Sequence, residues 1–155
     1  QLLLDNLIAD FRVDEAETAL ARFSRFDDSC RSLWYKAQIC LLKGENSAAE
    51  NCLTEMLERF SDDWLAWAYC GDLRARRADY NAAVECYQRS TELQPFPKYI
   101  DNYLCIANIS VIQKRYQTAA EYYAKTVELL KTDWNTTEGS AVEQYKALAE
   151  KYRNT

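Results

Sequence analysis

Residues 64–97 read WLAWAYCGDLRARRADYNAAVECYQRSTELQPFP, and this stretch decides the fold. The bulky Trp67 is followed four residues later by the small Gly71, and the small Ala83 is followed four residues later by the bulky Tyr87. Residues four apart lie on the same face of a helix. The stretch therefore predicts two helices, each with one large and one small side chain stacked on its packing face.

The same large, small, small, large pattern occurs in two further places along the chain. One copy lies 34 residues earlier, at Leu33, Ala37, Ala49 and Leu53, and another lies 36 residues later, at Tyr103, Ala107, Ala119 and Tyr123. A period of this length indicates an array of helix pairs, because one pair can bury its apolar face only against its neighbours. Small residues allow close helix approach, and the bulky residues fill the space beside them.

The central unit resembles the tetratricopeptide repeat family. It carries the family's pattern at Trp67, Gly71, Tyr80, Ala83, Tyr87, Leu93 and Pro95. The unit from Ile100 keeps the pattern without the terminal proline, and the unit from Cys30 has Asn46 where an aromatic residue is usual. The resemblance implies an all-α fold, a right-handed α-α superhelix of about three to four helix pairs with a C-terminal capping helix.

We expect a single domain over residues 1–155. The helix pairs are predicted at about 2–26, 30–60, 63–94 and 98–131, followed by a polar capping helix at about 137–152. The first pair has the weakest repeat pattern.

Local signals at the helix ends agree with this period. The spacings Ser47-x-x-Glu50 and Asp14-x-x-Glu17 predict capping boxes at the start of two helices. Asp62 and Asp63 are expected to cap the helix that carries Trp67. Pro95 is expected to end the preceding helix, because proline has no amide hydrogen and restricts the residue before it.

The composition excludes several classes of function. The 155 residues include no histidine, which removes Ser-His-Asp and Cys-His nucleophiles and His-ligated zinc. No glycine-rich phosphate loop or metal-ligand spacing occurs, so we expect no enzyme, with no catalytic, cofactor-binding or metal-binding residues. The net charge of −5 disfavours nucleic acid as a partner.

No stretch approaches 18 uninterrupted apolar residues, so we expect a soluble chain without membrane insertion. The first residue, Gln1, is not methionine, which indicates a processed fragment.

The cysteines also indicate the redox environment of the cellular compartment. The chain has six cysteines without a C-x-x-C pair, and Cys52 and Cys86 are 34 residues apart because they occupy the same repeat position. We expect free buried thiols in a reducing, cytoplasmic environment, whereas a secreted chain with disulfides is the alternative.

The family resemblance implies a function in protein binding. In the family, the first helix of each pair lines a concave groove. The groove residues implied here are Trp34, Tyr35, Gln38, Leu65, Ala68, Tyr69, Asp72, Arg76, Asp101, Leu104, Cys105 and Asn108. A peptide or helical segment with bulky apolar anchors is the expected ligand, in an adaptor, co-chaperone, or assembly or secretion chaperone role.

The sequence leaves two pairs of alternatives open. The chain is either a binding module or a structural scaffold segment of a larger protein that forms a homo-oligomer. The aromatic groove residues are either exposed or covered by the first helix pair.

The resemblance also predicts which ligands are refused. Co-chaperones of this family that hold the carboxylate tail of heat-shock chaperones carry Lys and Asn at set positions of the first helices. The lysine positions are occupied here by Trp34, Ala68 and Leu104, and the following positions by Gln38, Asp72 and Asn108. Only Asn108 matches, so acidic C-terminal tails are not expected to bind.

Overall fold

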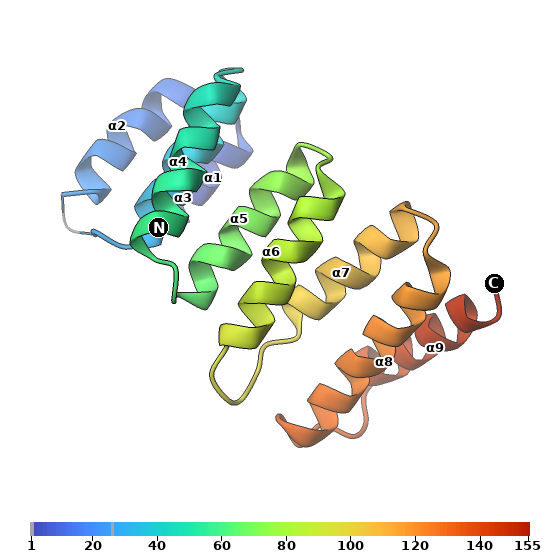
Figure 1. Cartoon of the computed structure of the whole chain (residues 1–155). Helices are drawn as coiled ribbons and strands as arrows, with labels where there is room; N and C mark the ends of the chain where they lie inside the picture. Colours follow the sequence, from blue (N-terminus) through green and yellow to red (C-terminus); the bar gives the residue numbers. More distant parts are fainter. Residues whose placement is uncertain (1, 26) are drawn as a thin grey trace. The chain divides into compact units, whose positions relative to one another are not determined.

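The computed structural model describes residues 2–25 and 27–155, and these residues form helices and turns without a strand. The helices are α1 (Leu2–Ala9), α2 (Val13–Phe23), α3 (Cys30–Leu42), α4 (Asn46–Arg59), α5 (Trp64–Arg76), α6 (Tyr80–Leu93), α7 (Asp101–Ile112), α8 (Tyr116–Thr132) and α9 (Ser140–Arg153) (Figure 1). Phe26, where the predicted first pair ends, lies outside the described residues. The predicted all-α fold is confirmed.

The chain divides into two compact units, one ending at Leu73 and the other running from Arg74 to Thr155. In the first unit, α1 and α2 pack together and α3 packs on both, while α4 pairs with α3. In the second unit, α7 packs on α6, α8 on α7, and α9 on α8.

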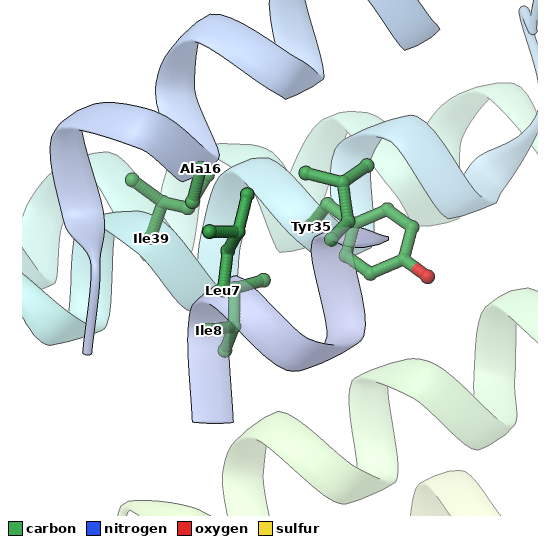
Figure 2. Packing of buried hydrophobic residues seen from close by; sticks show 6 residues of the cluster. Leu7, Ile8, Ala16, Tyr35 and Ile39 are labelled. Atoms are coloured by element: carbon green, nitrogen blue, oxygen red, sulfur yellow. The ribbon is translucent and has the colours of Figure 1, made fainter. Parts of the chain in front are cut away.

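The core of the first unit joins its first three helices. Figure 2 shows Leu7 and Ile8 of α1 and Ala16 of α2 beside Tyr35 and Ile39 of α3. Ala16 and Tyr35 are completely buried. The small Ala16 lets the helices approach, and the large ring of Tyr35 fills the space beside them.

The core of the second unit has two clusters built on the repeat positions. Ala83 and Tyr87 of α6 pack with Ile106 and Ile109 of α7. In the second cluster, Tyr123 of α8 packs with buried alanines from α7, α8 and α9. Most of the large and small residues of the period are thus core residues, whereas Trp67 and Tyr103 are half-buried.

The turns inside the helix pairs share one backbone conformation. Each has a residue with a positive φ: Phe11 at 58°, Gly44 at 77°, Ala78 at 59° and Lys114 at 60°. The amide of the following residue donates back to the preceding helix, with N···O distances of 2.9 Å for Arg12 to Leu7, 2.8 Å for Glu45 to Cys40, 3.0 Å for Asp79 to Arg74 and 2.8 Å for Arg115 to Ser110. This is the Schellman ending of a helix. The turn at Phe11 between α1 and α2 therefore has the same backbone conformation as the turns of the later pairs.

These turns correct the two predicted capping boxes. Helices α2 and α4 begin at Val13 and Asn46, after Arg12 and Glu45, and neither N-cap residue makes a side-chain capping hydrogen bond. The backbone bonds of the turn set these helix starts, so the predicted capping boxes at Asp14 and Ser47 are wrong. The prediction for Asp63 is confirmed, because its Oδ1 accepts a hydrogen bond from the Leu65 amide at 2.9 Å.

Candidate functional site

The predicted groove residues fall into two groups. Seven of the twelve belong to the first unit, from Trp34 to Asp72, and five belong to the second unit, from Arg76 to Asn108. That both groups share one concave face stays a prediction, and each group is described by itself.

In the first unit, Trp34 of α3 and Tyr69 of α5 form a stacked aromatic pair. Their ring centroids are 4.4 Å apart with an interplanar angle of 14°, and both side chains are half-buried. Stacking of this kind adds about 0.5–1.5 kcal/mol to the burial of the rings. We call Trp34, Tyr69 and the adjoining Arg31 the aromatic platform.

Arg31 holds the tyrosine of this platform in place. Its Nε donates to the Tyr69 hydroxyl oxygen at 3.3 Å. Burial raises the pKa of the Tyr69 hydroxyl, and this hydrogen bond acts in the opposite direction, while it raises the pKa of the Arg31 guanidinium. The tyrosine is therefore neutral and the arginine charged at neutral pH. Arg31 is not among the predicted groove residues, although its position three residues before Trp34 places it on the same helix face.

A hydrogen bond links the starts of α3 and α5, the two helices that carry the platform. The Cys30 thiol donates to Asp63 Oδ2 at 3.5 Å, and Asp63 also caps α5. Burial, reinforced by the Asp63 carboxylate, raises the pKa of the Cys30 thiol to about 12. This thiol is protonated and unreactive at neutral pH, so its role is to join the two helix ends that carry the platform.

Two predicted groove residues belong to the core instead. Tyr35 is 0% exposed, and its hydroxyl donates to Asp5 Oδ1 at 2.7 Å. Its ring meets Phe23 edge-on at 5.8 Å. Gln38 is 4% exposed. The first helix pair covers Tyr35, as one of the alternatives foresaw, and the half-buried Trp34 packs against the same core cluster, while Tyr69 is also half-buried.

The remaining groove residues of the first unit surround Tyr69 on α5. Leu65, Ala68 and Asp72 are all half-buried. Leu65 and Asp72 lie four residues before and three residues after Tyr69, so they share its side of the helix, whereas Ala68 directly precedes Tyr69 in the sequence. The face they form is mainly apolar, with one carboxylate.

In the second unit, four predicted residues lie on α7. Asp101 and Asn108 are exposed, and Leu104 is half-buried between them on the same helix face. Asn108 Oδ1 accepts a hydrogen bond from the Tyr123 hydroxyl at 2.6 Å, which fixes the amide orientation. Cys105 is directed into the core cluster of Ala83. The fifth residue, Arg76, is exposed at the end of α5.

Known proteins show where this arrangement of helices recurs. No family model matches the chain. The TPR repeat protein oca3 of Schizosaccharomyces pombe is 26% identical over 110 residues, which span 66% of this chain and 38% of oca3.

Solved structures give the clearer comparison. The TPR2B domain in the TPR2B-domain:pHsp70-complex of yeast Sti1 has a TM-score of 0.60 at 16% identity, covering 79% of this chain and 96% of that domain. The crystal structure of MamA also has a TM-score of 0.60 at 16% identity, covering 97% of this chain and 94% of MamA. The chain has the tetratricopeptide-repeat fold.

Tetratricopeptide-repeat domains generally serve protein–protein interaction and are typically non-catalytic. Among the described residues, no three His, Cys, Asp or Glu side chains gather where they could hold a metal ion. No helix within residues 2–25 and 27–155 is long and apolar enough to cross a membrane.

The tetratricopeptide-repeat helices also enclose the cysteines. All six are free thiols, five of them buried and Cys105 half-buried. The expectation of free thiols is confirmed.

Proposed function

We propose that this chain binds a peptide or helical segment of a partner protein, and that the aromatic platform of Trp34, Tyr69 and Arg31 is its principal contact. The observation that carries this proposal is the half-buried stacked pair on the first helices α3 and α5. Large aromatic rings beside arginine are the side chains that most often dominate protein interfaces.

The guanidinium of the platform supports a binding role over a purely structural one. Arg31 is held in place by Tyr69 and retains further N–H groups for a ligand. The proposed ligand therefore carries a bulky apolar anchor for the rings and an acceptor oxygen for the guanidinium.

The role in the cell follows as part of the same proposal. The chain acts as a non-enzymatic adaptor or chaperone-like module without a cofactor. Its six free thiols are consistent with a reducing compartment such as the cytoplasm. Because the aligned region spans only 38% of oca3, activities of a whole protein belong to this proposal as well.

Selection from a displayed peptide library tests the proposal, followed by calorimetry of a selected peptide. We expect the selected sequences to share bulky apolar residues. Trp34→Ala and Tyr69→Ala should weaken binding by about tenfold or more, since truncation of a central aromatic contact commonly costs 2 kcal/mol or more. Tyr99→Ala, at a 44% exposed aromatic position on the second unit, is the matched control.

The melting temperature separates binding from folding. Loss of binding with an unchanged melting temperature supports the platform. If both platform variants lower the melting temperature and still bind the peptide as the unaltered chain does, both residues are core residues and the proposal is wrong.

A further inference from the structure

The outer face of the first helix pair differs from the last helix. Helix α9 buries Val142 and Ala149 and exposes its charged residues. The pair α1–α2 instead exposes Leu3 at 62% and Phe11 at 73%.

A pocket lies in this outer face. It has a volume of about 440 Å³ and is lined by Leu3, Leu4, Leu7, Arg12, Glu15, Thr18, Ala19, Arg22 and Phe23. Its apolar lining comes mainly from α1 and the end of α2, and its polar lining comes from Arg12 and from α2. Exposed apolar side chains and an apolar pocket thus occur side by side on one surface. Such a combination is typical of a surface that another protein covers.

Along one face of α2, the charged residues are placed so that two antiparallel copies of the helix would bring opposite charges together. Glu15, Thr18, Ala19 and Arg22 lie on one helix face, with opposite charges at the two ends and small residues in the middle. Glu15 forms an ion pair with Arg12 at 2.5 Å, whereas Arg22 has no ion-pair partner among the described residues. When two such helices cross antiparallel at Thr18 and Ala19, Arg22 of each lies opposite Glu15 of the other.

We propose that the α1–α2 face binds a second copy of this chain, with α2 packed antiparallel on α2 of that copy. The small residues at the crossing allow close approach. The two Glu15–Arg22 pairs set the register, and Leu3 of each copy fills the apolar pocket of the other. A twofold interface of this kind uses the same patch on both copies.

The size of the face limits the strength of this dimer. Helix α2 has 11 residues and is therefore about 16 Å long, and two helices side by side are about 20 Å wide. The projected area is then about 320 Å² for each copy, well below the roughly 800 Å² that each partner of a stable complex usually buries. The dimer should therefore be weak and depend on concentration.

Sedimentation equilibrium of the full chain tests the proposal through a charge exchange. The average mass should rise from 18.0 kDa towards twice that value as the concentration increases from about ten micromolar to about one millimolar. Glu15→Arg alone and Arg22→Glu alone each place like charges opposite one another and should remain monomeric. An equimolar mixture of these two variants restores both opposite-charge pairs and should associate again.

A second pair of variants tests the apolar contact. Leu3→Glu should weaken association by about tenfold or more, because it places a charge in the pocket of the other copy. Ile112→Glu makes the same change at a 58% exposed position on α7 and should leave association unchanged. Circular dichroism checks that each variant retains its helices.

Three results would overturn the proposal. The unaltered chain could stay at the monomer mass over the whole concentration range. The two charge variants could associate separately as well as the unaltered chain does. Finally, the mixture could remain monomeric although the unaltered chain dimerises, which would place the contact on another face.

Discussion

At the residue scale, Tyr35 shows how one side chain joins the first helix pair to the rest of its unit. Its ring is buried among α1, α2 and α3, and its hydroxyl reaches Asp5 of α1 at 2.7 Å. Burial and the Asp5 carboxylate raise the pKa of this hydroxyl, so it stays a donor through the physiological range. The contact combines aromatic packing with a hydrogen bond to a charged acceptor, which is stronger than a bond between neutral groups.

Tyr35→Phe removes this hydrogen bond and keeps the ring. We expect the free energy of unfolding to fall by about 1–2 kcal/mol, because Asp5 is partly accessible and water replaces part of the lost bond. Urea unfolding measures the change. The matched control is Tyr145→Phe, since the Tyr145 hydroxyl has no hydrogen bond to another described residue. Equal midpoints for the two variants would show that the Asp5 contact does not stabilise the fold.

At the scale of the element, the turns inside the helix pairs share one backbone conformation that their side chains do not predict. The four positive-φ residues are Phe11, Gly44, Ala78 and Lys114, and only the glycine is a residue type that favours this conformation. The Schellman hydrogen bonds come from the backbone and hold the turn with any side chain. The other three positions therefore carry local strain of about 1 kcal/mol each.

Lys114→Gly should relieve this strain. Lys114 is exposed, so little packing is lost, and we expect the free energy of unfolding to rise by about 0.5–1 kcal/mol. Lys114→Ala is the control, because it removes the same side chain and keeps the strain. Gly44→Ala should destabilise the chain by a similar amount in the opposite direction. A glycine variant no more stable than the alanine variant in thermal unfolding would contradict this interpretation.

The same elements show what the sequence predicts and what it leaves out. Large and small residues recur at a fixed period because they pack helix on helix, so the period predicted the pairs and the core positions Ala83 and Tyr87. Turns held by backbone hydrogen bonds impose no such pattern on the sequence, and for this reason the predicted capping boxes were wrong. Trp34 and Tyr35 are neighbours in the sequence but differ by about 100° around the helix. Contacts with residues distant in the sequence, among them Asp5, 30 residues away, identify Tyr35 as the core residue.

At the scale of the whole molecule, the net charge of −5 restricts which partners can approach. A chain with this charge repels acidic ligands at long range unless cations gather at the site. The proposed binding face of the first unit carries one cation, Arg31, which keeps N–H groups for an acceptor oxygen, and one carboxylate, Asp72, so it has no net positive charge. The field and the site therefore both favour ligands with apolar anchors and little negative charge.

Acidic C-terminal tails should not bind this chain, although the Sti1 structure with a similar fold is a complex with pHsp70. The positions where related co-chaperones carry lysine are Trp34, Ala68 and Leu104 here, so a terminal carboxylate meets no cation at them. Calorimetry with a peptide that ends in acidic residues and a free carboxylate should show no binding up to about 1 mM. The same peptide with an amidated terminus is the control and should behave identically. A dissociation constant in the micromolar range that is lost on amidation would mean that another cation, such as Arg31 or Arg76, holds the carboxylate, and the proposed preference for apolar ligands would be wrong.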